Sequence, residues 1–194
     1  MIIGDSFLWL HLPKTGGTSM NRLFRERDLA GVAVDPDDTH QKHDSVALRE
    51  SRGRWRAGER KRFITVRRLE HWLISDWLHK RRHMNLPNLD FEPVRSGLFY
   101  SLRLGGKWVA ADWWLEYFEV NEYMIPLRLE YLKEDLGRKL LPLLTENIDS
   151  FKMLTRENSM PKKDHIGFPR ISGDDLKRAW KCNPHWKEWE DSVY

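Results

Sequence analysis

The sequence lacks the features that mark several common protein classes. One cysteine, Cys182, occurs in 194 residues, so neither an internal disulfide nor a four-cysteine zinc site can form. No apolar run reaches the length of about 18 residues that a membrane-spanning helix needs. The first residues also lack the basic and apolar stretches of a secretory leader. These absences favour a cytoplasmic protein without a membrane span.

Strong charge and repetition are also missing. The formal net charge is only +4, which suits an anionic ligand but is too small to indicate nucleic-acid binding. We find no internal repeat and no low-complexity segment. The length fits one domain covering residues 1–194. No pattern in the sequence indicates the oligomeric state.

Tryptophan, in contrast, is abundant. The ten tryptophans include Trp113–Trp114 and a second group at Trp180, Trp186 and Trp189. Large rings are mostly buried, so these residues predict a core built around tryptophan. The alternative is an aromatic-lined groove for a sugar or another flat acceptor.

Apolar residues alternate between strand and helix spacing along the chain. Short apolar runs predict strands at Ser6–Leu12, Phe63–Val66 and Met124–Leu129. Pro126, in the last of these, suits an edge or irregular position better than a central one. Helical spacing predicts helices after Ser19, from Thr39 to about Glu50, after Leu69, over Ala110–Tyr117, over Leu132–Leu144, after Ser172 and after Pro184. Residues 84–107, rich in Pro, Gly and Asn, predict a long loop with short helical pieces. The alternation predicts an α/β fold, with a P-loop-like parallel sheet flanked by helices.

A glycine-rich segment lies between the first strand and the first helix. Glycines allow a ligand to approach the backbone, and the N–H groups and dipole of the helix favour an anion there. Hydroxyl groups add donors, and a lysine adds a full positive charge. We name this segment the glycine loop; the residues expected to bind the anion are Lys14, Thr15, Gly16, Gly17, Thr18 and Ser19.

The order of residues in the glycine loop differs from that of the usual ATP-binding loop. That loop reads GxxxxGK[ST], with the lysine after the glycines, whereas Lys14 precedes Gly16 and Gly17. No apolar strand ending in aspartate offers a magnesium site of the Walker-B kind. Both observations disfavour a magnesium-dependent phosphotransferase, which is kept as an alternative.

The glycine loop and its flanks resemble a known family. Phe7–Ser19 reads FLWLHLPKTGGTS and is similar to the 5′-phosphosulfate loop of sulfotransferases related to heparan sulfate 2-O-sulfotransferase and its bacterial relatives. The resemblance implies that the co-substrate is 3′-phosphoadenosine-5′-phosphosulfate (PAPS). It also implies a sulfotransferase-type domain that transfers a sulfuryl group to a hydroxyl or amine.

A second segment extends the resemblance. Phe63–Ser75 reads FITVRRLEHWLIS, and by resemblance Arg67 and Ser75 hold the 3′-phosphate of PAPS. The family usually has Asp-Pro or Asn-Pro after the arginine, whereas this chain has Arg68 and Leu69. Arg68 is therefore expected to add positive charge near the nucleotide. Weaker similarity covers Gln41–Glu50 and Leu127–Asp135, so that the whole resemblance spans roughly residues 6–145.

Sulfuryl transfer needs an in-line arrangement, neutralisation of the leaving phosphate and a base for the acceptor's proton. Lys14 is expected to neutralise the 5′-phosphate. His43 is the first candidate for the base, although it equally fits a buried structural histidine. The reserve candidates are His11, His40 and Asp44.

This chemistry requires no metal, and the histidines show no HExxH spacing. His79 and His83 are four apart but have no adjacent partner ligand, so solvent exposure is expected.

Two further charged pairs have open interpretations. Arg128 and Glu130 predict an internal ion pair that supports the sheet. Lys162 and Lys163 lie in a polar loop that, by resemblance, closes over PAPS, or else form an exposed charge pair.

The acceptor is not identified by any motif. The tryptophans favour a carbohydrate or glycolipid over another small molecule. A non-catalytic module that binds a polyanion is the remaining alternative; it predicts a salt-dependent affinity without nucleotide preference.

Overall fold

The computed structural model describes residues 1–144 and 169–194. The chain divides into two compact units. Among the described residues, the first unit comprises residues 1–66 and 117–144, and the second comprises residues 67–116 and 169–194. The expectation of one domain over the whole chain stays a prediction, and each unit is described by itself. In the described part of the chain, no helix combines the length and the apolar character that crossing a membrane requires.

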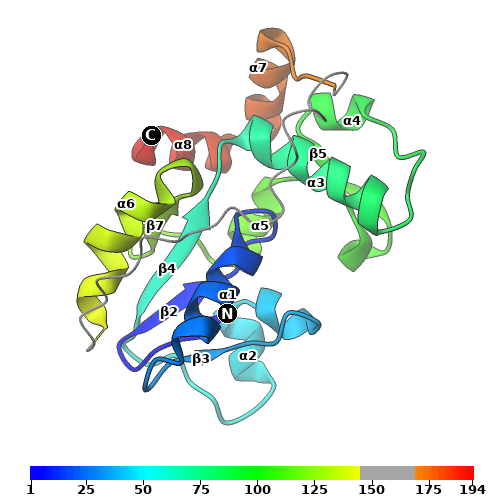
Figure 1. Ribbon diagram of the computed structural model, residues 1–194. Coiled ribbons are helices and arrows are strands. Elements are labelled where there is room, and N and C mark those ends of the chain that lie inside the picture. The colour runs from blue at the N-terminus through cyan, green and yellow to red at the C-terminus, as the bar shows by residue number, and fades with distance from the viewer. Residues whose placement is uncertain (145–168) are drawn as a thin grey trace. The chain divides into compact units, whose positions relative to one another are not determined.

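The first unit is built on a five-stranded sheet with the order β3-β1-β2-β4-β7 (Figure 1). The strands β2, β4 and β7 are parallel neighbours, whereas β1 pairs antiparallel with both β2 and β3. This arrangement confirms the predicted α/β class with parallel strands at its centre. The strand bounds are β1 Ile2–Ile3, β2 Phe7–Leu10, β3 Ala33–Val34, β4 Lys61–Val66 and β7 Ile125–Arg128.

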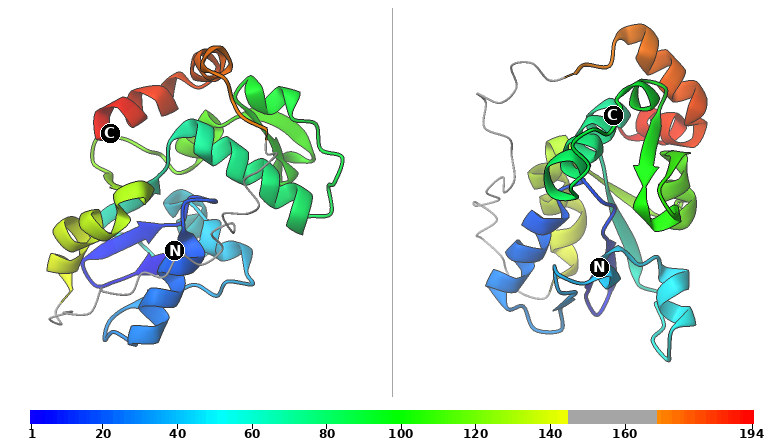
Figure 2. Two further views of the ribbon diagram at one scale, coloured as in Figure 1. Left: turned by 45° about the horizontal axis from the view of Figure 1, so that its top comes forward. Right: turned by 90° about the vertical axis from the view of Figure 1, so that its right-hand side faces the viewer.

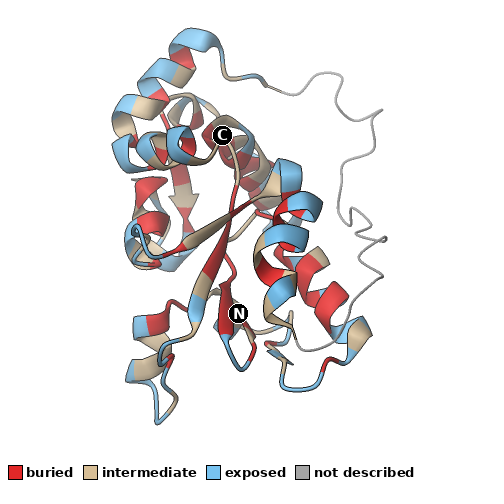
Figure 3. Ribbon diagram, turned by 90° about the vertical axis from the view of Figure 1, so that its left-hand side faces the viewer, coloured by how far each residue is buried: buried red, intermediate tan, exposed pale blue. Residues whose placement is uncertain are grey.

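Large apolar side chains on one face of this sheet form the core of the first unit. Trp9 of β2 lies opposite Phe63 of β4, and all four residues of β2 are buried (Figure 3). Helix α1 (Gly17–Arg27) and the segments α6 (Leu132–Asp135) and η4 (Leu136–Leu140) pack their apolar sides into the same cluster. Each fully buried large side chain stabilises the fold by about 1.5–3 kcal/mol. The cluster consists of Ile2, Phe7, Trp9, Met20, Leu23, Phe24, Leu29, Phe63, Leu127, Leu132, Leu136 and Leu140.

Strand β7 ends the sheet, as the proline in it predicted. Pro126 lies in β7 opposite Ile64 of β4, and β7 is the outermost strand. A proline lacks an N–H donor, so an edge strand tolerates it. The helical stretch predicted to follow is present, but it passes from α6 into the π-helical segment η4 and ends in the 3₁₀ turn η5 (Leu141–Leu143).

The helix predicted from Thr39 to Glu50 is wrong as a single element. A 3₁₀ turn, η1 (His40–His43), is followed by an extended residue, Asp44, and then by helix α2 (Val46–Ser51). Ser45 caps α2, because its hydroxyl oxygen accepts a hydrogen bond from the N–H of Leu48 at 3.2 Å. Capping at Ser45 rather than Thr39 separates His43 from the helix that was expected to carry it.

The second unit begins with helix α3 (Leu69–His83), as predicted. Residues 84–107 contain the short helical pieces that were expected, but the rest is not all irregular loop, because it includes a strand that was not predicted. They contain helix α4 (Glu92–Arg95), strand β5 (Leu98–Ser101) and the turn η2 (Leu102–Leu104), and β5 pairs antiparallel with β6 (Lys107–Ala110). Two glycines with φ of +73° and +77° connect the strands, so this glycine pair marks a hairpin turn. Helix α5 (Asp112–Tyr117) follows β6.

The two C-terminal helices agree with the sequence. Helices α7 (Gly173–Cys182) and α8 (Pro184–Val193) are the orange and red helices of Figure 2. Helix α7 begins after a capping box made by Ser172 and Asp175, and α8 has proline at its first position. Asn183 joins them: its side-chain nitrogen donates to the carbonyls of Gly97 and Ala179, and its oxygen accepts the N–H of Asp112.

Half of the tryptophans support the core interpretation outright. Trp9, Trp72, Trp77, Trp114 and Trp186 are buried. The other five are half-buried: Trp55, Trp108, Trp113, Trp180 and Trp189.

Candidate functional site

The glycine loop starts where β2 ends and runs into α1. Lys14 has φ +66° and Gly16 has φ +85°, so left-handed residues stand on both sides of Thr15. Such alternation of backbone handedness is typical of anion-binding loops. The N–H groups of residues 15–19 donate no backbone hydrogen bond within the described structure; the first bond of α1 runs from Met20 to the carbonyl of Gly16 at 3.1 Å. Consecutive donors and the positive end of α1 therefore coincide here.

The side chains of the glycine loop are not equivalent. The hydroxyl of Thr15 is buried and donates to the carbonyl of Leu12 at 2.7 Å, so in this structure Thr15 offers a ligand its backbone N–H and not its hydroxyl proton. Thr18 is exposed, and Lys14 and Ser19 are half-buried.

The two glycine positions of the loop exclude larger residues for different steric reasons. Gly16 has a left-handed backbone, and a Cβ there would also lie 2.8 Å from Cδ1 of Leu129. A Cβ on Gly17 would lie 1.5 Å from Nε2 of His11. The ring of His11 therefore packs directly against the first residue of α1.

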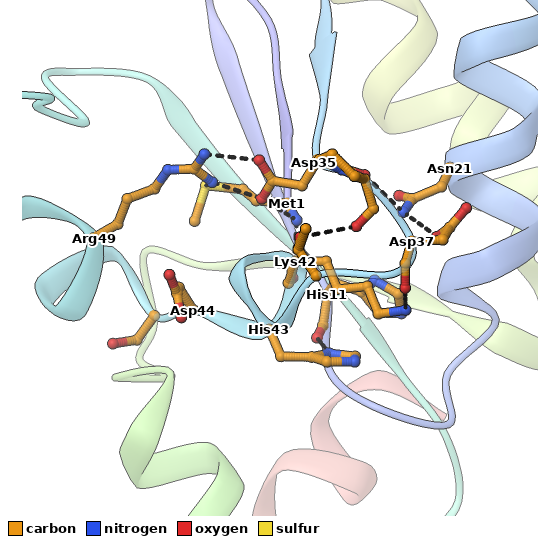
Figure 4. Close-up of polar contacts among 12 residues, drawn as sticks. Met1, His11, Asn21, Asp35, Asp37, Lys42, His43, Asp44 and Arg49 are labelled. Atoms are coloured by element: carbon orange, nitrogen blue, oxygen red, sulfur yellow. Dashed lines mark hydrogen bonds and ion pairs between the residues drawn. The ribbon is translucent and has the colours of Figure 1, made fainter. Parts of the chain in front are cut away.

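His11 and His43 form a pair beside the glycine loop (Figure 4). Their ring centres lie 4.5 Å apart, and Nδ1 of His43 lies 2.9 Å from the carbonyl oxygen of His11. A carbonyl only accepts hydrogen bonds, so Nδ1 of His43 carries the proton. In the neutral ring the lone pair then lies on Nε2, which is the tautomer that a general base needs.

Burial keeps His11 neutral. The side chain is 4% exposed, and its Nδ1 has no hydrogen-bond partner in the part of the chain that the structure describes. Desolvation, followed by the charges of His43, the N-terminus, Lys42 and Lys14, lowers the pKa of His11 well below its ordinary value. His11 is therefore a poor proton acceptor, and of the two histidines His43 is the better candidate for the base.

A network of charges fixes the segment that carries His43. The carboxylate of Asp35 accepts two hydrogen bonds from Arg49, at 2.6 and 2.7 Å, and one from the Met1 ammonium at 3.0 Å. The Met1 ammonium also donates to the carbonyl of Lys42 at 2.8 Å (Figure 4). Because Lys42 precedes His43, this network ties η1 to the first strand. No motif in the sequence indicated it.

The other reserve candidates for the base are less suitable. His40 is exposed. Asp44 is 1% exposed, and its Oδ2 accepts a hydrogen bond from Arg52 at 2.5 Å, whereas Oδ1 has no hydrogen-bond partner among the described residues. The salt bridge holds Asp44 as a structural counter-ion of Arg52.

Arg128 is correctly predicted as structural, but Glu130 is not its partner. The guanidinium of Arg128 binds both carboxylate oxygens of Asp135, at 2.8 and 2.9 Å, and Asp135 also accepts the backbone N–H of Arg128 at 2.7 Å. This pair closes the turn between β7 and α6, where the side chain of Asp135 is 1% exposed. Spacing alone suggested Glu130, whereas the turn brings Asp135 back to the strand end.

The second candidate group, Arg67 and Ser75, belongs to the second unit. Arg67 directly follows Val66, the last residue of β4, and Ser75 lies in α3; both residues are half-buried. Since β2 and β4 are parallel neighbours, the segments that leave their carboxyl ends start from the same edge of the sheet. Ligands in open α/β sheets usually bind at this edge.

The expected extra charge of Arg68 is offset. Its guanidinium lies 3.4 Å from Glu190 and 4.4 Å from the ring centre of Tyr194. No motif had indicated that a residue of α8 would neutralise this arginine.

Three remaining expectations concern a pair of lysines, a pair of histidines and metal binding. Lys162 and Lys163 lie outside the described residues. His83 is exposed, as expected, whereas His79 is half-buried. In residues 1–144 and 169–194 no three side chains of the metal-binding types are grouped, and the absence of a metal requirement stays a prediction.

Comparisons with protein-family models, with curated proteins and with solved structures found no match to this chain.

Proposed function

We propose that this protein is a sulfotransferase that takes its sulfuryl group from PAPS. The observation that carries the proposal is the glycine loop, where the N–H groups of residues 15–19 have no backbone acceptor among residues 1–144 and 169–194 and lie at the start of α1. A phosphosulfate is an anion of the kind that such a helix start binds. The sequence of the loop supports this donor over ATP, because Lys14 precedes the glycines.

In this proposal the two ends of the nucleotide have separate partners. The N–H groups of the glycine loop and the charge of Lys14 bind the 5′-phosphosulfate. Arg67 and Ser75 bind the 3′-phosphate, the former through two guanidinium donors and the latter through its hydroxyl. A 3′-phosphate distinguishes PAPS from ATP and AMP, so Arg67 would set the preference for the donor.

The chemical step is an in-line displacement at sulfur. The acceptor's oxygen or nitrogen forms a bond to sulfur while the bond from sulfur to the 5′-phosphate oxygen breaks. The products are a sulfated acceptor and adenosine 3′,5′-bisphosphate. Lys14 neutralises the charge that develops on the leaving phosphate, and Nε2 of His43 takes the acceptor's proton, since its Nδ1–H is held by the carbonyl of His11.

The acceptor is proposed only as a class. Half-buried aromatic residues of the β5–β6 hairpin, Tyr100 and Trp108, lie in contact with each other at a ring distance of 5.4 Å. Aromatic faces of this kind suit the apolar face of a sugar, which favours a carbohydrate or glycolipid hydroxyl.

Thermal unfolding with added nucleotides tests the proposal against its two alternatives. Adenosine 3′,5′-bisphosphate should raise the melting temperature, because a ligand that binds only the folded state stabilises it. AMP, and ATP with magnesium, should raise it less. A larger shift with ATP and magnesium would support the phosphotransferase alternative, and equal shifts with heparin and all nucleotides would support a polyanion-binding module.

A further inference from the structure

Helix α8 contacts the turn between β4 and α3 at three consecutive residues. We call residues 67–69 the arginine turn. Nε1 of Trp186 donates to the carbonyl of Arg67 at 3.2 Å. Glu190 accepts the N–H of Leu69 at 2.9 Å and lies 3.4 Å from the guanidinium of Arg68.

The contacting residues of α8 share one face of the helix. Trp186, Glu190 and Tyr194 follow one another at intervals of four residues, which places them in line along an α-helix. Trp186 is fully buried and Glu190 is 6% exposed. A carboxylate with so little solvent is stable only where its hydrogen bonds and charge are matched, and the arginine turn supplies both.

The start of α8 is itself fixed within the second unit. The two carboxylate oxygens of Asp112 accept the N–H groups of His185 and Trp186, at 2.9 and 2.8 Å. The ring of Trp186 packs against that of Trp72 in α3, with 5.0 Å between the ring centres. The helix is therefore anchored at the Trp186 end of the contact, so it can hold the arginine turn in one conformation.

We infer that Glu190 and Trp186 are positioning residues for Arg67, and that α8 thereby sets the preference for a nucleotide with a 3′-phosphate. This inference rests on the proposed function. Glu190 accepts from the first N–H of α3, so the turn keeps its shape without a ligand. It also offsets the charge of Arg68, so that the anion's position is determined by Arg67 rather than shared between neighbouring arginines.

Alanine and glutamine at position 190 separate the two roles of the carboxylate. Both Glu190→Ala and Glu190→Gln release the charge of Arg68, but only glutamine keeps an oxygen that accepts from Leu69. The difference between these variants therefore reports the hydrogen bond to the arginine turn. Glu188 is exposed on the same helix, and Glu188→Ala is the matched control.

Two measurements test the inference. Calorimetric titration gives the ratio of the affinities for adenosine 3′,5′-bisphosphate and AMP, and amide hydrogen exchange of Leu69 reports the turn in the absence of nucleotide. Glu190→Ala should lower the ratio about tenfold, the effect of losing one hydrogen bond to a charged group, and should speed the exchange of Leu69. Glu190→Gln should restore most of the affinity ratio and most of the protection of the Leu69 amide, and Glu188→Ala should change neither quantity.

A second pair of variants guards against a folding defect. Trp186→Phe removes the donor to the carbonyl of Arg67, whereas Trp189→Phe makes the same change at a half-buried position of α8. Trp186→Phe should lower the ratio of the affinities for the bisphosphate and AMP, and Trp189→Phe should leave that ratio unchanged.

The outcomes separate this inference from the proposed function. Suppose that the unmodified protein prefers the bisphosphate. If Glu190→Ala keeps that preference, or weakens the binding of AMP and of the bisphosphate by the same factor, the inference is wrong and the proposed function stands. If the unmodified protein has no preference for the bisphosphate, the proposed function fails and the inference fails with it.

Discussion

The ring of His11 lies against the backbone of Gly17, so closely that a Cβ on the glycine would come within 1.5 Å of Nε2. This contact joins the strand before the glycine loop to the helix after it. It explains the second glycine by packing, whereas the first is required by its left-handed backbone. The shape of the loop therefore depends on His11 as well as on the loop's own residues.

Substitution of Gly17 by alanine should destabilise the protein. The methyl group would overlap a fully packed ring and force His11 or α1 to move, at a cost of about 1–3 kcal/mol. Chemical denaturation would measure the loss. Gly173 is the matched control, because it is likewise the first residue of a helix and no atom of the described residues lies within 4 Å of a Cβ there. Equal stability of Gly17→Ala and Gly173→Ala would contradict the packing argument.

Protonation of His11 should couple the stability of the protein to pH. The pKa of His11 is lowered well below its ordinary value, chiefly by desolvation. Its contribution is therefore complete above the ordinary pKa and is lost as the pH falls from there toward the folded-state pKa. The free energy of unfolding should fall by at most about 1.4 kcal/mol per pH unit in that window.

Variants of two histidines isolate this effect. His11→Leu replaces a neutral buried ring with an apolar group and should flatten the slope, measured as the unfolding free energy at several pH values below 6.5. His40→Gln, at an exposed position, should leave the slope unchanged. An unchanged slope in His11→Leu would show that other groups cause the pH dependence.

Removal of the Asp35 carboxylate should be strongly destabilising. Asp35→Asn leaves the buried Met1 ammonium and Arg49 without their counter-charge, and breaking a buried ion pair costs about 3–5 kcal/mol. Glu26→Gln breaks the exposed Arg22–Glu26 pair and should cost less than about 1 kcal/mol. Denaturant titration of both variants at neutral pH makes the comparison, and similar losses would contradict it.

The same carboxylate predicts acid sensitivity. Burial alone would raise the pKa of Asp35, but the hydrogen bonds from Arg49 and the Met1 ammonium outweigh it and lower that pKa. Asp35 thus stabilises the fold above its ordinary pKa, and this contribution disappears as the pH falls through the folded-state pKa. The free energy of unfolding should therefore fall less for Asp35→Asn than for the unmodified protein when the pH is lowered from roughly 5 to 3, because the variant lacks the titrating carboxylate.

Lys14 should matter for binding more than for folding. Its φ of +66° is unfavourable for a residue with a side chain, so Lys14→Gly relieves the backbone while removing the charge. We expect the unfolding free energy of Lys14→Gly to stay within about 1 kcal/mol of the original value and the affinity for adenosine 3′,5′-bisphosphate to fall at least about tenfold. Lys14→Gly that binds as tightly as the unmodified protein would remove Lys14 from the proposed site.

The sequence predicted the local parts of this structure well. The strand, glycine loop and helix at Phe7–Arg27 follow from apolar spacing and glycine placement, and Pro126 correctly indicated an edge strand. The β5–β6 hairpin was not predicted, because glycine-rich segments are as typical of irregular loops as of hairpin turns.

Long-range partners could not be predicted in this way. Asp35 meets Arg49, and Glu190 meets Leu69, only because the fold brings distant segments together. Likewise, Arg128 pairs with Asp135 because the turn after β7 reverses the chain. A charge pattern in the sequence identifies candidates for such pairs, but packing decides between them.

Calorimetric titration with adenosine 3′,5′-bisphosphate tests the central claim most directly. The unmodified protein should bind it more tightly than AMP or magnesium-ATP, and Lys14→Ala and Arg67→Ala should each weaken that binding at least about tenfold. Lys61→Ala, at an exposed position in β4, should bind as the unmodified protein does. Equal affinity for all three nucleotides, or binding that survives both substitutions, would contradict the assignment of PAPS as the donor.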